Sequence, residues 1–195
     1  MDAKTYFDSH AQGYDKERVS GPVGMLVTKE RGNVLALLDP KKGEDILDAG
    51  CGSGYYSVIL KEKGAKPFGV DFSEKMVKEL KTKGIPGEVA NLESFNLKKK
   101  FDKIVCGGAL EFTTRPEAAL KSMASHLKEG GTLVLVYPRK SLAGFAYRLF
   151  HRTHGVRIHL FTKKGMQTLL EQAGMEELKT VKSDPLTNVV LAEKK

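Results

Sequence analysis

The chain has little of several features that mark particular classes of protein. It has no Trp, only two Cys among 195 residues, and no apolar run long enough to span a bilayer. The N-terminus also lacks the basic-then-apolar order of a signal peptide. No His or Cys lies beside Cys51 or Cys106 at metal-ligand spacing, so we expect two reduced, mostly buried thiols and no metal site. These absences argue against a disulfide-stapled or membrane-spanning protein and predict a cytoplasmic one.

The composition is that of one globular domain with an excess of positive charge. Hydrophobic residues make up 41% of the chain and the net charge is +8. This is enough apolar material for one buried core and enough charge to attract anions, whether nucleic acid, an anionic metabolite or an acidic membrane surface. Much of the excess is Lys in stretches typical of solvated loops, such as 98–100. The interleaved aromatic and basic residues of an RNA-binding sheet are absent, which disfavours nucleic acid as the partner.

A glycine-rich turn is the most informative stretch. It follows the apolar pair Ile46-Leu47, opens an apolar-periodic segment at 55–60, and reads Asp48-Ala49-Gly50-Cys51-Gly52-Ser53-Gly54. A strand, a glycine turn and a helix start in this order predict a site where backbone N–H groups approach a nucleotide-like ligand. A dinucleotide fingerprint would need its third glycine where Tyr55 stands, so the spacing disfavours NAD. The alternative is a tight strand-to-helix connection with no ligand.

Strands and helices are predicted to alternate along the rest of the chain. A strand at 66–70 ends in Asp71, and Ser73 offers an N-cap for a helix that runs to about Lys81. Further strands are predicted at 85–90, 101–106, 133–137, 175–181 and 187–192, and further helices at 116–127, 142–150 and 161–173. Gly130-Gly131 is expected to stop the helix that begins at 116. The alternation predicts an α/β fold with a parallel sheet covered on both faces.

The pattern D-x-G-x-G-x-G at 48–54 resembles motif I of the class I S-adenosylmethionine (SAM)-dependent methyltransferases. The resemblance extends over about residues 5–193 and includes the turn at 127–133, which is similar to the family's L-K-P-G-G-x-L with Glu129 in place of Pro. It implies a single domain over residues 1–195 with a Rossmann-like three-layer sandwich. The seven-stranded sheet would be mostly parallel with an antiparallel C-terminal strand. It also implies transfer of a methyl group from SAM, leaving S-adenosylhomocysteine (SAH), to a small-molecule acceptor.

The resemblance assigns cofactor-binding roles to residues at the ends of the first two strands. Asp48 would suit the cationic amino-acid end of SAM, within the loop formed by Gly50, Cys51, Gly52 and Gly54. Asp71 would accept hydrogen bonds from both ribose hydroxyls, a contact that dinucleotide enzymes share. Phe72 would offer an apolar face to the base, although an aromatic at a strand end is more often core.

Two further segments match the family with differences. The string at 89–95 places Asn91 where the family has an Asp against the adenine amino group, and the Leu92 backbone beside it would meet a ring nitrogen. An Asn oxygen still accepts such a bond, but capping its own loop is the alternative. Gly107, with Cys106 and Gly108, would let the loop after the fourth strand come close to the methyl donor. Glu111 in that loop faces the substrate or is only a helix-start charge.

The two ends of the predicted site would be closed by less regular segments. The string at 6–15 resembles an F-D-x-x-A-x-x-Y-D lead-in, so Tyr14 would contact SAM from an N-terminal lid at about 1–23, or would only pack on the body. A substrate cap is expected at about 139–160. Its apolar helix is a cover for an aromatic or prenylated acceptor, or ordinary core. His154 and His159 in this segment are the candidate general bases for an oxygen acceptor.

Three functions are consistent with the sequence. The leading one is a SAM-dependent methyltransferase acting on oxygen of an aromatic, prenylated or acidic metabolite, with nitrogen and carbon acceptors open. The basic excess and the apolar helix favour an anionic or lipid-like substrate and a peripheral contact with a membrane surface. A second is an NAD-dependent oxidoreductase, and a third is a non-catalytic module that binds SAM or RNA on the same fold. The charge also permits a tRNA substrate.

Overall fold

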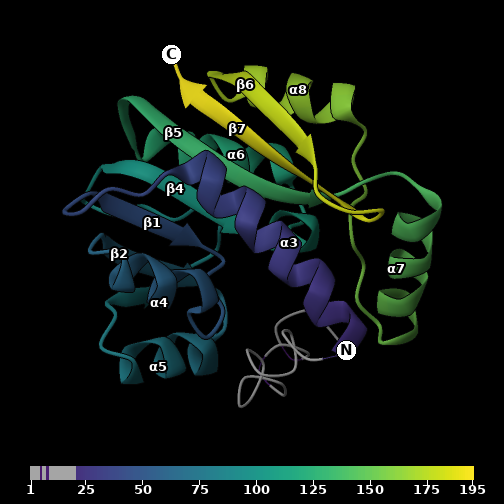
Figure 1. Ribbon diagram of the computed structural model, residues 1–195, viewed down its shortest axis with the longest axis horizontal. Coiled ribbons are helices and arrows are strands. Elements are labelled where there is room, and N and C mark those ends of the chain that lie inside the picture. Colours follow the sequence, from purple (N-terminus) through teal and green to yellow (C-terminus); the bar gives the residue numbers. More distant parts are fainter. Residues whose placement is uncertain (1–4, 6–7, 9–20) are drawn as a thin grey trace.

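The computed structural model describes Thr5, Asp8 and residues 21–195 of the chain. Seven strands form one sheet in the order β3-β2-β1-β4-β5-β7-β6 (Figure 1). Their bounds are β1 Asp45–Ala49, β2 Lys66–Asp71, β3 Gly87–Val89, β4 Phe101–Gly107, β5 Leu127–Pro138, β6 Met175–Lys182 and β7 Thr187–Lys194. The pairs from β3 to β5 are parallel, whereas β7 runs antiparallel to both β5 and β6. The predicted fold class, a mostly parallel sheet with an antiparallel C-terminal strand, is confirmed.

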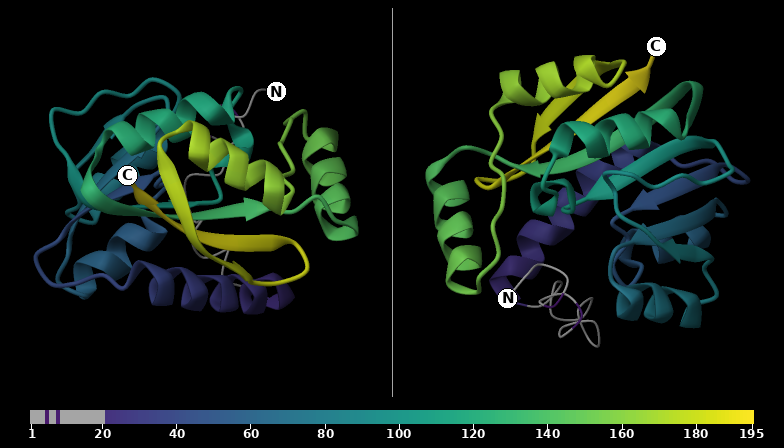
Figure 2. Two further views of the ribbon diagram at one scale, coloured as in Figure 1. Left: turned by 90° about the horizontal axis from the view of Figure 1, so that it is seen from above. Right: turned by 180° about the vertical axis from the view of Figure 1, so that it is seen from behind.

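Helices cover both faces of this sheet. The helices are α3 Gly21–Leu38, α4 Tyr55–Glu62, α5 Glu74–Thr82, α6 Pro116–Ser125, α7 Leu142–Thr153 and α8 Lys163–Gln172, with a 3-10 turn η1 at Leu110–Phe112. α3 and α4 lie on one face, and α6 and α8 lie on the other (Figure 2). α7 stands apart from the sheet, beyond the end of β5 (Figure 1). No helix in the described part of the chain has the length and apolar character needed to cross a membrane.

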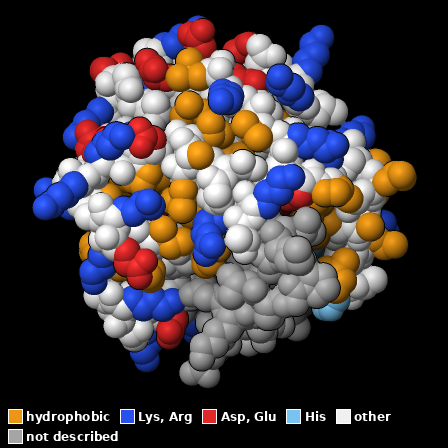
Figure 3. All heavy atoms as spheres, viewed as in Figure 1, with side chains coloured by type: hydrophobic (Ala, Val, Ile, Leu, Met, Phe, Trp, Pro, Cys, Tyr) orange, Lys and Arg blue, Asp and Glu red, His pale blue; other side chains and the backbone are white. Residues whose placement is uncertain are grey.

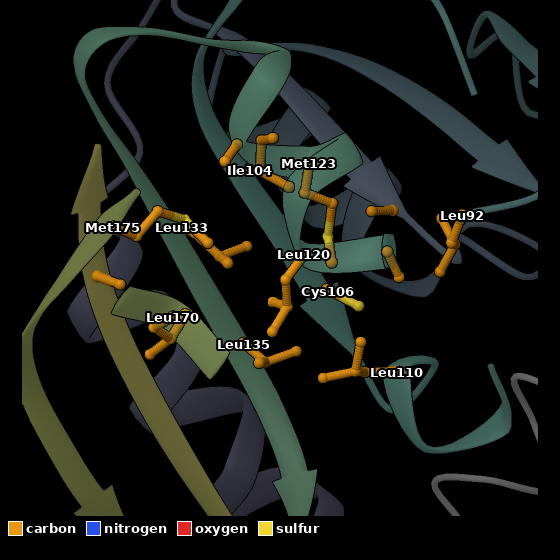
Figure 4. Close-up of a cluster of buried hydrophobic side chains, with 14 of the residues drawn as sticks. Leu92, Ile104, Cys106, Leu110, Leu120, Met123, Leu133, Leu135, Leu170 and Met175 are labelled. Carbon is orange, nitrogen blue, oxygen red and sulfur yellow. The ribbon is translucent and has the colours of Figure 1, made fainter. Parts of the chain in front are cut away.

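The core follows from the alternation of side chains along the central strands. Leu133 and Leu135 of β5 point into the larger cluster with α6 and α8, while Val134 and Val136 point into the cluster with α3 and α4. Figure 4 shows the larger cluster, in which Leu120, Met123 and Leu170 of the helices meet Ile104 and Leu135 of the sheet. Strands buried on both faces read as continuous apolar runs, which is why 133–137 was recognisable as a strand.

Several element boundaries differ from the prediction. β3 covers only 87–89, and β5 begins at Leu127 and continues to Pro138. The helix that begins at Pro116 ends at Ser125, with His126 as its C-cap, so Gly130-Gly131 lies within β5 and does not stop a helix. The reason is that residues 127 and 132–136 pair with β4 across a register shift. The two glycines therefore lie inside the strand, at the irregularity in its pairing with β4.

Two helices were also misjudged. α3 was not predicted at all, although the buried Glu30, Val34 and Leu38 share one face at four-residue spacing. α8 begins at Lys163 because Thr162 caps it, its side-chain oxygen accepting from the N–H of Gly165 at 3.0 Å. The predicted first residue, Phe161, instead pairs with Arg139 in an isolated parallel bridge. The prediction for Ser73 is confirmed, since its oxygen accepts from the N–H of Met76.

The turn between β6 and β7 is a meeting point of three elements. The guanidinium of Arg139, just after β5, donates to the carbonyl oxygens of Asp184 and Pro185 at 3.2 and 2.5 Å. From α3, the Asn33 amide donates to the Ser183 hydroxyl at 3.1 Å. The buried Thr187 hydroxyl lies 3.1 Å from a carboxyl oxygen of Glu30, also on α3. These contacts fix the segment after β5 to the C-terminal hairpin.

The strand order places one crevice at the carboxyl edge of the sheet. From β1 the chain continues to β2 on one side, and it returns to β4 on the other side. The pairing sets Asp48 beside Gly69 of β2 and Val105 of β4. Ligands of open α/β sheets bind where the strand order reverses in this way. The loops that follow β1, β2 and β4 are therefore the candidate site.

Candidate functional site

Three glycines shape the loop after β1. Gly50, Gly52 and Gly54 have φ angles of +75°, +51° and +102°, in the left-handed region that side chains disfavour. A Cβ at Gly50 would lie 2.2 Å from the Cβ of Ala109, and one at Gly54 would lie 2.6 Å from Leu80 Cδ1. At Gly52 the nearest atom would be the Met76 sulfur at 4.0 Å. Gly50 and Gly54 are therefore needed for packing, while the half-buried Gly52 has room for a methyl group among the described residues.

Asp71 ties this loop to the end of β2. One carboxyl oxygen accepts from the N–H of Gly52 and the other accepts from the N–H of Ser73, both at 2.9 Å. The residue is only 5% exposed. Burial raises the pKa of this carboxyl and the nearby Asp8 adds to the rise, while the backbone N–H groups oppose it. The predicted ribose acid thus stands beside the open glycine, held by backbone donors on both sides.

Asp48 lies beneath the loop. Its exposed fraction is 1%, and one carboxyl oxygen accepts from both the N–H and the hydroxyl of Ser57, at 3.0 and 2.6 Å. Gly54, the N-cap of α4, has no side chain to satisfy the first N–H groups of that helix. Asp48 supplies this cap from the preceding strand and puts negative charge at the positive end of the helix. Any influence of Asp48 on a ligand would pass through the loop that it orders.

The two cysteines are free and buried, as predicted. Burial raises the pKa of Cys51, and the carboxylates of Asp48 and Asp71 raise it further. Burial likewise raises the pKa of Cys106, and the carboxylates of Glu111 and Asp48 raise it further. Both thiols are therefore protonated at neutral pH and unsuited to nucleophilic work. In the described part of the chain, no three His, Cys, Asp or Glu side chains are grouped closely enough to hold a metal ion.

The loop after β3 is stabilised by hydrogen bonds from its own side chains. Asn91 is exposed, and its side-chain oxygen accepts from the N–H of Glu93 at 2.9 Å, which is the loop-capping alternative. Leu92 is buried and packs in the core. Glu93, which the sequence did not single out, forms a 3.0 Å ion pair with Arg115 and accepts from the N–H of Thr114. Burial alone would raise the pKa of Glu93, but Arg115 and the backbone donors lower it overall.

Gly107 has a packing role in the structure. A Cβ there would lie 2.2 Å from the ring of Tyr56, so a side chain would displace α4 from the end of β4. The absence of a side chain thus lets Tyr56 pack closely here, and the approach of this loop to the methyl donor stays a prediction. Phe72 is half-buried next to Asp71. Tyr14 and most of the lid expected at 1–23 lie outside the described residues.

The predicted bases are both exposed and are held differently. His154 is the C-cap of α7, and its Nδ1 lies 2.8 Å from the carbonyl oxygen of Phe150. His159 is anchored next to the loop after β4, because its N–H donates to the carbonyl of Glu111 at 2.9 Å. Glu111 is buried, as is His151, whose ring packs edge-on against Phe112. Burial lowers the pKa of His151, and His154 lowers it further.

A lysine that the sequence analysis did not select also contacts the glycine loop. The ammonium of Lys83, which follows α5, donates to the carbonyl of Ser53 at 2.7 Å. The contact spans thirty residues of sequence, so no local pattern identifies it. It fixes the loop at Ser53, between Gly52, which Asp71 holds, and Gly54.

This is the fold of the class I SAM-dependent methyltransferases. The model of the methyltransferase domain family matches residues 28–180, so the chain belongs to that family. Solved structures show the same fold at low identity. The magnesium protoporphyrin IX methyltransferase of Synechocystis PCC 6803, solved with SAH, has a TM-score of 0.77 and 21% identity over 98% of each chain. The N-methyltransferase NodS of Bradyrhizobium japonicum, also solved with SAH, has a TM-score of 0.77 and 17% identity over 100% of this chain and 99% of that one.

Curated relatives match over a shorter region. The ubiquinone biosynthesis O-methyltransferase of Coxiella burnetii is 29% identical over 115 residues, which is 55% of this chain and 49% of that protein. The chain thus spans about half the length of the curated relatives it matches. Their names and those of the structural neighbours include oxygen and nitrogen methylation, so the shared fold leaves the acceptor open.

Proposed function

We propose that the protein transfers the methyl group of SAM to an oxygen atom of a small-molecule acceptor. The observation that carries the proposal is the link between Asp71 and Gly52, which sets a buried carboxylate beside the half-buried backbone of the glycine loop at the crevice of the sheet. Membership of the methyltransferase family supports the reaction type. The name of the curated relatives supports oxygen as the acceptor atom.

The residues of the site fit SAM. Asp71 is a carboxylate whose remaining lone pairs suit two ribose hydroxyls, beside the bonds that it accepts from the N–H groups of Gly52 and Ser73. Gly52 leaves room for the ligand to approach the loop, with Met76 as the nearest side chain. Phe72 stands next to Asp71 for an apolar contact with the base. The Asn91 oxygen accepts from the N–H of Glu93 with one lone pair and keeps a second one for the adenine amino group.

Positioning is the main contribution that these residues make to the reaction. SAM supplies a methyl group already activated by its sulfonium, so an aligned acceptor and an absence of water provide much of the rate. Asp71 and the glycine loop fix the donor side. His159, held at the loop after β4, takes the proton that a phenol or alcohol loses when its oxygen attacks the methyl carbon. The acceptor is aromatic, prenylated or acidic, and the exposed Arg157, in the same segment as His159, suits an acidic one.

Calorimetric titration with SAM, SAH and NAD tests the donor. Saturable binding of SAM and SAH but not NAD is expected, with a loss in Asp71→Ala. Asp102→Ala is the matched control, because Asp102 is also an acid that accepts a backbone N–H but stands at the start of β4. Binding of NAD in place of SAH would favour an oxidoreductase, and binding of SAH without transfer to any acceptor would favour a non-catalytic module.

Methyl transfer from labelled SAM to a panel of phenols, carboxylates and amines tests the acceptor. His159→Gln should lower kcat for a phenol at neutral pH with little change in SAH affinity. His154→Gln is the matched control, since its ring is held by its own helix. Equal losses in the two variants, or transfer only to amines, would contradict the role of His159 or the choice of oxygen.

A further inference from the structure

The outer face of α7 is the largest concentration of exposed apolar side chains in the described part of the chain. Six large hydrophobic residues are exposed among the described residues, and four of them lie on α7: Leu142 (91%), Phe145 (40%), Leu149 (63%) and Phe150 (53%). Figure 3 shows hydrophobic side chains gathered at the right edge of the molecule, over the position of α7. Monomeric proteins rarely expose such a group without a partner.

These side chains point away from the protein body. On a helical wheel, Leu142, Phe145 and Leu149 form one stripe, and Gly144 and His151 lie on the opposite side. Gly144 and His151 are the buried residues of α7. A Cβ at Gly144 would lie 1.9 Å from the carbonyl oxygen of Arg139, so this face is pressed against the segment after β5. The apolar stripe is therefore exposed and is not core, which is one of the two roles expected from the sequence. The other role, a cover for the acceptor, stays a prediction.

The surrounding segment is strongly basic. Residues 130–170 contain seven Lys or Arg and three His but no Asp or Glu. Arg148 and Arg152 flank the apolar stripe on α7, and the guanidinium of Arg148 lies 4.9 Å from the centre of the Phe145 ring. An apolar stripe with cations along its border is the pattern of a helix that lies in the interface of an anionic membrane.

We propose that α7 docks the protein on an anionic lipid surface, with Leu142, Phe145 and Leu149 entering the acyl boundary and Arg148 and Arg152 meeting phosphate groups. A second copy of the chain suits this face less well, because a twofold contact through α7 would bring the same arginines together. Nucleic acid would use the cations but not the protruding Leu and Phe side chains.

Hydrogen bonds at the N-terminal end of α7 attach the helix firmly to the rest of the protein, so docking through α7 orients the whole molecule. The N–H of Lys140 donates to the carbonyl oxygen of Phe161 at 2.9 Å, and the N–H of Phe161 donates to the carbonyl oxygen of Pro138 at 3.0 Å. Ser141 caps α7 and its hydroxyl also reaches the carbonyl of Pro185 at 3.2 Å. Because β5 ends at the carboxyl edge of the sheet, docking through α7 places the crevice close to the lipid.

Vesicle flotation of the full chain tests the proposal, with vesicles of phosphatidylcholine alone or mixed with phosphatidylglycerol. The protein should float only with the anionic vesicles. Arg148→Ala/Arg152→Ala should lower the partition coefficient about 30-fold, from the attraction of two cations near the surface. Phe145→Ser/Leu149→Ser should lower it at least about tenfold through lost apolar burial.

Matched controls distinguish membrane binding through α7 from binding caused by positive charge or exposed hydrophobic residues elsewhere on the protein. Lys75→Ala/Lys78→Ala removes two exposed cations from α5, and Leu178→Ser removes an exposed Leu from β6; both should float as the parent does. The proposal is overturned if the parent stays out of the anionic vesicles or if the α5 variant loses as much binding as the α7 variant. A dimer in sedimentation velocity that Phe145→Ser/Leu149→Ser abolishes would instead assign the face to a second copy. Titration with SAH in the absence of vesicles keeps this outcome independent of the methyltransferase proposal.

Discussion

Replacing Gly52 with Ala should separate ligand binding from folding at the glycine loop. The new methyl group has space, because its nearest neighbour would be the Met76 sulfur at 4.0 Å. The backbone φ of +51° remains a cost for any side chain, about 1–2 kcal/mol of unfolding free energy. The same methyl group would occupy the surface that the ligand approaches, so the affinity for SAH should fall about tenfold or more, equivalent to about 1.4 kcal/mol.

Two other glycines provide the comparison. Gly43→Ala has the same kind of penalty, with a φ of +86° and no atom within 4 Å, but lies in the turn before β1 at the opposite edge of the sheet. It should lose as much stability as Gly52→Ala and bind SAH normally. Gly50→Ala adds an overlap at 2.2 Å with the Ala109 Cβ, for a total of about 2–5 kcal/mol.

Urea unfolding and calorimetry with SAH on the three variants measure these effects separately. The reasoning is refuted if Gly52→Ala binds SAH as tightly as the parent, or if it unfolds as easily as Gly50→Ala. Equal loss of SAH binding in Gly43→Ala would show that loss of stability, and not the added methyl, controls the affinity.

Three other predictions concern the same crevice. Burial raises the pKa of Asp71, so SAH affinity should be full above that pKa and fall about tenfold per pH unit below it; calorimetry across pH should show this slope and Asp71→Asn should remove it. Lys83→Met should weaken SAH binding about fivefold by freeing the Ser53 carbonyl, with the KM of the acceptor unchanged, while Lys83→Arg should restore it. Because burial raises the pKa values of Cys51 and Cys106, iodoacetamide should modify neither in the native protein and both in urea, as mass spectrometry would detect.

Much of the fold was predictable because the central strands and helices carry strong periodic patterns. The apolar run at 133–137 and the Ser73 cap are local signals with a direct physical cause. The start of β5 was missed because its pairing with β4 across a register shift, and not local propensity, makes a strand of the Gly130-Gly131 region. α3 was missed because a buried acid, Glu30, sits on its inner face and weakens the apolar periodicity.

The site was predictable at the level of position but not of contacts. A motif places Asp71 and Gly52 at adjacent strand ends, and the structure joins them. It does not show that Asp48 serves as the cap of α4, because that bond depends on the turn geometry of the whole loop. The contact from Lys83 depends on tertiary packing across the molecule. The direction of the apolar face of α7 is likewise invisible to periodicity, which gives the stripe but not the side that meets the body.

The paired ends of the segment from Arg139 to Phe161 have a consequence for how this protein can change. The two ends of the segment pair with each other, and Arg139 at its start donates a hydrogen bond to the turn between β6 and β7. The glycine loop and Asp71 belong to the other half of the sheet. The contacts that hold the segment, the bridge between Arg139 and Phe161 and the bond from His159 to Glu111, all lie outside β1, β2 and the glycine loop. Changes within the segment should therefore alter the acceptor side or the docking of the protein while the donor half stays intact.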